Sequence, residues 1–190
     1  MKKSLLLLLW LAATTLMSCQ KDEPIELIDY SALNAKPGFL VNQFKFTYSF
    51  REQDSTGVQG YYTEVFSLTN DSSANVLVRG YNTKDSLIDE YTSSYNYFNR
   101  LMIVDAFPLW FTGGNVGEVK DLGGVTIKFV QKDINTTTPL GTFSCNRFDV
   151  TIFEETQVVL VDKDFKYPFI KLGFLVNNQP EYFYEAIKNK

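Results

Sequence analysis

The stretch Phe44-Lys45-Phe46-Thr47-Tyr48-Ser49-Phe50 alternates aromatic and polar side chains without interruption. Successive side chains of a β-strand point to opposite faces, so this alternation predicts a strand with one aromatic face turned toward a core. An amphipathic helix would instead repeat its apolar residues three and four positions apart. The period that decides the fold of this chain is therefore two.

The same period recurs along the rest of the chain. Residues 61–69 and 76–81 predict strands joined by a turn of Asn, Asp and Ser, and residues 125–129 alternate again after a glycine-rich loop. Residues 132–141 are predicted to form a loop, and residues 180–188 either a strand or a short helix. Further strands are predicted over residues 87–97, 142–153, 157–161, 169–176 and 182–187.

These segments predict an all-β domain with an antiparallel sheet of about eight to ten strands. Such a sheet can form a half-barrel, close into a barrel, or split into a β-sandwich, and alternation alone does not choose among them. The segment Pro139-Leu140-Gly141-Thr142-Phe143-Ser144-Cys145 resembles a strand start of LolA-like half-barrel lipoproteins. This resemblance covers seven of the 190 residues and implies a half-barrel.

The amino terminus has the pattern of a secretory signal. Lys2 and Lys3 precede a continuous apolar stretch, residues 5–13, which is too short for a comfortable transmembrane helix and suits a signal peptide. Leu16-Met17-Ser18-Cys19 resembles the lipobox of bacterial lipoproteins. That resemblance implies cleavage before Cys19 and attachment of diacylglycerol to its sulfur, which would hold the chain at a membrane.

The residues after Cys19 refine the expected location. Lys21-Asp22-Glu23 resembles the short charged signal that sends lipoproteins of Bacteroidota-type bacteria to the outer face of the outer membrane. The resemblance implies a lipid-anchored, surface-exposed protein, with a periplasm-facing anchor as the alternative. The expected organisation is a signal peptide over 1–18, a lipidated cysteine and tether over 19–37, and a single β-domain over 38–190.

Composition excludes several kinds of chemistry. The chain has no histidine and two cysteines, so a catalytic triad based on histidine is impossible and a structural zinc site is not expected. The 22 acidic side chains outnumber the 18 basic ones, and no basic run follows the signal peptide. Nucleic-acid binding, which needs a basic stripe, is therefore not expected. No cofactor is predicted.

An aromatic stretch before the glycine-rich loop is the candidate binding site. Phe107, Trp110 and Phe111 could form the lip of a ligand pocket or a partner-binding patch. The alternative is that these rings close the end of the core, since large aromatics dominate cores as well as interfaces.

No catalytic residue is predicted. Glu154 and Glu155 are adjacent on an extended chain and point to opposite faces, so they cannot flank one glycosidic bond. Asp149 or Glu181 could partner either one, but the sequence selects neither. Cys145 lies in an alternating strand and is predicted to be a buried, inert thiol.

Two short motifs resemble the O-glycosylation sequon of Bacteroidota-type exported proteins. They are Asp54-Ser55-Thr56 and Asp85-Ser86-Leu87, and both fall in predicted loops. The resemblance implies glycans on Ser55 and Ser86.

The expected function is a non-enzymatic, membrane-anchored envelope lipoprotein whose β-domain binds a ligand or partner. The partner could be a hydrophobic molecule, a glycan or a protein. The second hypothesis is a structural or assembly subunit of a surface complex. The third is a carboxylate-based hydrolase, which would require a pair of carboxylates in one cleft.

Overall fold

The computed structural model describes residues 36–52 and 57–188, which form an all-β domain of twelve strands. Cys19 and Ser55 lie outside the described residues. No helix in the described part of the chain is long and apolar enough to cross a membrane. The strands are β1 (Lys45–Phe50), β2 (Gly60–Asn70), β3 (Ser73–Asn82), β4 (Leu87–Phe98), β5 (Leu101–Val104), β6 (Phe107–Phe111), β7 (Val119–Asp121), β8 (Val125–Thr138), β9 (Gly141–Ile152), β10 (Glu155–Asp162), β11 (Lys171–Val176) and β12 (Gln179–Ile187).

All twelve strands belong to one antiparallel sheet, with the order β6-β5-β4-β3-β2-β1-β12-β11-β10-β9-β8-β7. Each half of the sheet is a meander of six consecutive strands, and the halves join where β1 pairs with β12, Tyr48 opposite Ala186. The prediction of an antiparallel all-β fold is confirmed. The sheet is one continuous layer whose end strands, β6 and β7, are not paired with each other, so a closed barrel is wrong.

The predicted count of eight to ten strands is too low because three strands are short. β5, β6 and β7 have 4, 5 and 3 residues, which is too few to display a clear alternation. The predicted loop over 132–141 is also wrong: β8 continues to Thr138 through two register irregularities between Phe129 and Ile134. Each bulge adds a residue and reverses which side chains face inward, so the strand does not show a continuous period-two alternation in the sequence. Residues 180–187 lie in β12, so the segment 180–188 is not a helix.

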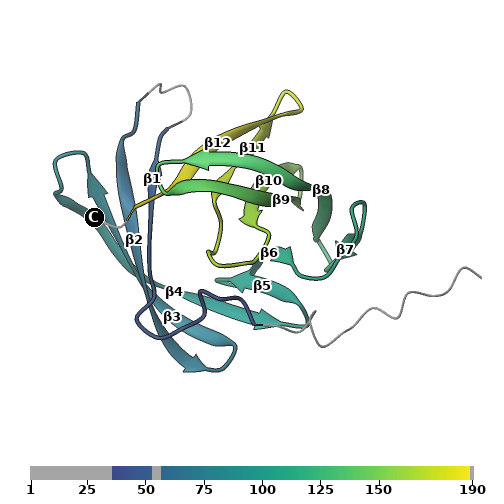
Figure 1. Cartoon of the computed structure of the whole chain (residues 1–190), viewed down its shortest axis with the longest axis horizontal. Helices are drawn as coiled ribbons and strands as arrows, with labels where there is room; N and C mark the ends of the chain where they lie inside the picture. Colours follow the sequence, from purple (N-terminus) through teal and green to yellow (C-terminus); the bar gives the residue numbers. More distant parts are fainter. Residues whose placement is uncertain (1–35, 53–56, 189–190) are drawn as a thin grey trace, which may run out of the picture. The chain divides into compact units, whose positions relative to one another are not determined.

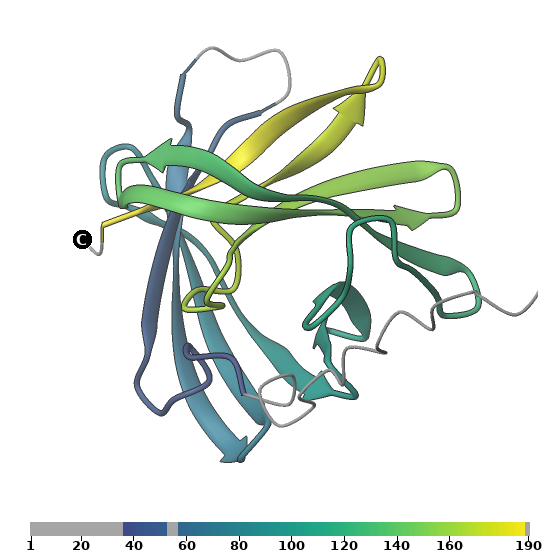
Figure 2. The ribbon, with the colours of Figure 1, turned by 45° about the vertical axis from the view of Figure 1, so that its right-hand side comes forward.

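The two halves of the sheet curl toward each other, with strands β8–β10 running across the direction of β1–β3 (Figures 1 and 2). The inner face holds the core, in which Phe39, Phe66 and Trp110 are fully buried. The connection between β10 and β11 enters the space between the halves (Figure 2). Phe169 in this connection packs against Phe46, with ring centroids 5.1 Å apart, and the Pro168 carbonyl accepts a hydrogen bond from the Trp110 indole at 2.9 Å.

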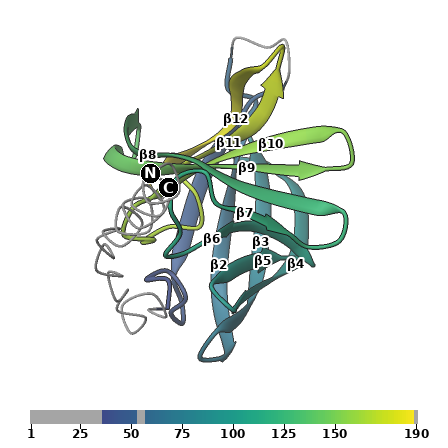
Figure 3. The same ribbon diagram turned by 90° about the vertical axis from the view of Figure 1, so that its right-hand side faces the viewer.

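The end strand β6 packs against the opposite half of the sheet through its side chains and forms no backbone pairing with the strands of that half. The Phe111 ring lies 5.3 Å from the Phe148 ring of β9. Figure 3 shows β6 facing the strands of the second half across the interior. The packed aromatic rings thus close one part of the curled sheet.

Candidate functional site

A second part of the interior is open. Between the inner faces of the two halves lies a cavity of about 520 Å³. Eight of its seventeen lining residues are aromatic, and five of these are tyrosines. The first half contributes residues of β1 to β6, and the second half residues of β9 to β12 and the β10–β11 connection. A cavity of this size, lined mostly by aromatic and aliphatic side chains, has the character of a small-molecule site.

Glu64 is the carboxyl group on the inner wall of this cavity. It lies on β2 between Tyr62 and Phe66 in the inward phase of the strand, and its exposed fraction is 4%. The Tyr95 hydroxyl donates to both carboxyl oxygens, at 3.1 and 3.0 Å. Burial raises the pKa of Glu64 to about 7, although hydrogen bonds from Tyr95 and Tyr48 act in the opposite direction. Glu64 therefore changes its charge near neutral pH.

Asp105 brings a second carboxylate to the same cavity. It occupies the β5–β6 turn with Ala106, and both residues have positive φ, 47° and 71°, as the two-residue turns of tight hairpins require. The Ser93 hydroxyl and the Ser94 amide donate to its two oxygens, each at 2.7 Å. These bonds fix the carboxylate against β4, and its charge contributes to the raised pKa of Glu64.

The lining contains no lysine or arginine among the described residues. Glu64 and Asp105 accordingly face the cavity without a basic side chain in its wall. Such a site can accept hydrogen bonds and stabilise positive charge, whereas it disfavours anions.

The structure separates the aromatic residues that the sequence grouped together. Trp110 and Phe111 are buried in the core, with exposed fractions of 0% and 1%. Phe107 is 52% exposed and lines the cavity, as does Leu109. The core interpretation therefore fits Trp110 and Phe111, whereas the role of Phe107 in binding stays a prediction. Ser86 is exposed in the turn between β3 and β4, where its amide donates to Asn82 at 3.0 Å.

Of the carboxylates considered from sequence, Glu154 and Glu155 both line a hollow of about 480 Å³, and neither Asp149 nor Glu181 joins them there. Glu154 and Glu155 are exposed at the β9–β10 turn. Their suggested partners are occupied elsewhere: Asp149 binds Arg147 at 2.8 Å, and Glu181 lies 3.5 Å from Arg51. No group of three potential metal ligands occurs in residues 36–52 and 57–188.

Cys145 is fully buried, as predicted. Burial raises the pKa of its thiol to about 11, so the thiol is protonated at neutral pH. A protonated and inaccessible thiol is a poor nucleophile, which agrees with the predicted inert state.

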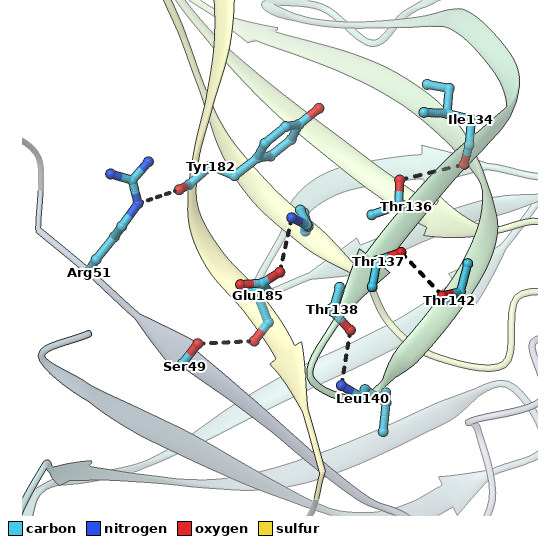
Figure 4. A network of polar contacts seen from close by, with 11 residues as sticks. Ser49, Arg51, Ile134, Thr136, Thr137, Thr138, Leu140, Thr142, Tyr182 and Glu185 are labelled. Carbon is cyan, nitrogen blue, oxygen red and sulfur yellow. Dashed lines mark hydrogen bonds and ion pairs between the residues drawn. The ribbon is translucent and has the colours of Figure 1, made fainter. Parts of the chain in front are cut away.

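A second groove of about 320 Å³ lies where β1, β11 and β12 meet, and Figure 4 shows its polar contacts. Lys171 forms an ion pair with Glu185 at 2.9 Å, and Arg51 donates to the Tyr182 carbonyl at 2.9 Å. These charges are partnered within the sheet. The groove is therefore a weaker candidate than the cavity that contains Glu64.

Sequence reasoning missed Glu64, although a signal was present. Tyr62, Glu64, Phe66 and Leu68 share one phase of the β2 alternation. Because Tyr62, Phe66 and Leu68 are aromatic or apolar, this side of the strand is predicted to face the core. Burying the Glu64 carboxylate among them costs free energy unless it has a polar partner or a functional role. A glutamate within this otherwise apolar series was the sequence evidence for a carboxyl group that faces the core.

Comparison with known proteins adds a fold likeness. No family model matches the chain, and no curated protein is similar to it in sequence. A crystal structure of a Bacteroides fragilis protein, described as a putative exported protein with a YmcC-like fold, is similar with a TM-score of 0.49 and 9% sequence identity. The match covers 80% of this chain and 97% of that chain. The identity is too low to transfer a ligand or an activity.

Proposed function

We propose that this chain is a membrane-anchored envelope lipoprotein whose β-domain binds a small ligand in the interior cavity without transforming it. The observation that carries the proposal is the 520 Å³ cavity lined by aromatic rings. A structural subunit has no need of such a space, because native interiors are otherwise packed to the density of organic crystals. The lipobox resemblance at Cys19 supports the anchor.

The ligand-binding part of the proposal can be tested with a neutral fluorescent probe, N-phenyl-1-naphthylamine. The probe should bind the wild-type domain and gain fluorescence as it leaves water. Leu172→Trp places an indole in the cavity lining and should abolish the gain. Leu175→Trp is the matched control, because Leu175 is on the same strand β11 but does not line the cavity. Equal binding by both variants would contradict a cavity site.

The anchor is tested separately in cells. Cys19→Ser removes the sulfur to which the lipid would be attached. Two or three acyl chains bind essentially permanently to a membrane, so the wild-type chain should sediment with membranes and incorporate labelled palmitate. The variant should lose the label. Persistent labelling of the Cys19→Ser variant would remove the anchor from the proposal.

A carboxylate-based hydrolase is the second candidate, and the pairing of Glu64 with Asp105 in one cavity favours it. A carboxyl group with a pKa near 7 that shares a cavity with a second carboxyl group is the pattern of a general acid and its partner. Aryl glycosides that release a chromophore provide the test. Turnover that disappears in both Glu64→Gln and Asp105→Asn would support this candidate, and absence of turnover in the wild type would remove it.

A further inference from the structure

The charge of the cavity wall restricts what the cavity can hold. Glu64 and Asp105 line it, and no lysine or arginine of the described residues does. Glu64 is buried and its hydrogen bonds come from neutral tyrosine hydroxyls. A buried carboxylate without a cation is costly to ionise, and a positive charge in the cavity would remove that cost.

The aromatic rings are concentrated beside this carboxyl group. Tyr48 stacks on Tyr62 with centroids 5.5 Å apart, and it also meets Phe169 at 5.0 Å and Tyr184 at 5.9 Å. All four rings line the same cavity as Glu64. Aromatic faces carry negative electrostatic potential and attract cations such as quaternary ammonium groups. The rings and the carboxyl group therefore favour the same kind of ligand.

We propose that the cavity binds an organic cation, namely an amine or quaternary ammonium group on an apolar body, with Glu64 as counter-charge and the surrounding tyrosine rings as its walls. This inference rests on the proposed ligand-binding function and gives the ligand a chemical class. The charged head pairs with Glu64, while the apolar body contacts Leu109, Leu172 and the aromatic lining.

Other ligand classes fit the wall less well. Fatty acids and phosphates would bring negative charge toward Glu64 and Asp105 with no basic side chain in the lining to receive it. A neutral apolar molecule would displace water from Glu64 without providing a hydrogen bond or a positive charge to replace it. A neutral sugar could stack on tyrosines, and it is therefore included among the test compounds.

The proposal has a pH dependence with a definite sign. The titratable groups around Glu64 and across the cavity are Tyr48 of β1, Tyr62 of β2, Tyr91 and Tyr95 of β4, Asp105 of the β5–β6 turn and Tyr184 of β12. Burial raises the pKa values of Tyr48 and Tyr95, and that of Tyr91 to about 12, so these phenols stay neutral near neutral pH. Glu64 is then the group that ionises as the pH rises through about 7, and cation affinity should rise with it.

Two probes of the same shape test the charge. Benzyltrimethylammonium carries a fixed positive charge, and neopentylbenzene replaces its nitrogen with carbon. At about pH 8.5 the cation should bind the wild-type domain at least about tenfold more tightly than the neutral isostere, as expected for a desolvated cation among aromatic rings and a carboxylate. Calorimetric titration measures both, and methyl glucoside and benzenesulfonate complete the series.

Glu64→Gln keeps the size of the side chain and removes its charge. The cation should lose about tenfold in affinity for this variant, while the neutral isostere should change less than about twofold. Glu90→Gln is the control, because Glu90 is an exposed residue of β4 that pairs with Arg79 and does not line the cavity. Circular dichroism of each variant confirms folding before the comparison.

The outcomes separate the two proposals. If the cation and its isostere bind equally to the wild type, or if the sugar or the sulfonate binds best, the cavity is a ligand site but the cation assignment is wrong. If none of the probes binds, and N-phenyl-1-naphthylamine does not bind either, both proposals fail. Preferential cation binding that is lost in Glu64→Gln and kept in Glu90→Gln supports both.

Discussion

Two aromatic regions share the inner face of the curled sheet, the packed region around Trp110 and the open region around Glu64. In the packed region the Phe39 ring packs edge-to-face against both Phe66 and Trp110, and none of the three side chains is exposed to solvent. In the open region rings line a 520 Å³ cavity that contains Glu64. Both regions are lined by aromatic side chains. The open region differs from the packed one in its empty volume and its inward-facing carboxyl group, and these two features mark it as a binding site.

The largest effect that the comparison predicts is on stability. Trp110→Ala removes a fully buried indole and its hydrogen bond to the Pro168 carbonyl, so it should lower the free energy of unfolding by about 3–5 kcal/mol. Urea denaturation followed by tyrosine fluorescence and circular dichroism measures the change. A loss below about 1 kcal/mol would mean that this region is not a packed core.

Glu64→Gln should produce an intermediate effect that depends on pH. The folded-state pKa of Glu64 is raised from 4.5 to about 7, so the folded chain binds the proton more tightly than the unfolded chain does. Stability from this group is full below the unfolded pKa and is lost as the pH rises through 7, by roughly 3 kcal/mol in total. Relative to the wild type, the variant should therefore become more stable between about pH 5 and about pH 8.5.

The Glu90→Gln variant again serves as the control for this prediction. Glu90 is 46% exposed and pairs with Arg79 at the surface, so its removal should leave the pH dependence of unfolding close to that of the wild type. Unfolding free energies are measured across the pH range for the three proteins. Parallel curves for the wild type and Glu64→Gln would show that Glu64 is solvated in the folded state.

Phe107→Ser should have the smallest effect on stability. Phe107 is 52% exposed at the cavity, and exposed substitutions usually change stability by less than about 0.5 kcal/mol. The same variant should weaken binding of N-phenyl-1-naphthylamine, because Phe107 lines the cavity. A large destabilisation without a change in binding would place Phe107 with the packed region instead.

The sequence predicted the fold class because alternation survives in the long strands. The period-two rows of β1 and β2 give the antiparallel sheet directly. Strand order, the crossing of the halves and the open ends follow from contacts between distant residues, such as Phe111 with Phe148, which no local pattern records. The sheet could be predicted, whereas the choice among half-barrel, closed barrel and sandwich could not.

The candidate site was only partly visible in the sequence. Phe107 was named, but it was grouped with Trp110 and Phe111, which lie 1% or less exposed in the core. Phe107 is three positions from Trp110 and four from Phe111, and this spacing does not show which ring packs in the core and which lines a cavity. Asp105 and Glu64 meet only because the β5–β6 turn folds back toward the inner face of β2, which requires the assembled sheet.

The central claim is that the open region is a ligand cavity, and a crystal structure of the wild-type domain with bound N-phenyl-1-naphthylamine tests it most directly. We predict electron density for the probe between the two halves of the sheet, in contact with Tyr62 and Leu172 and next to Glu64. A probe bound elsewhere, with the cavity filled by the side chains that line it here, would contradict the account.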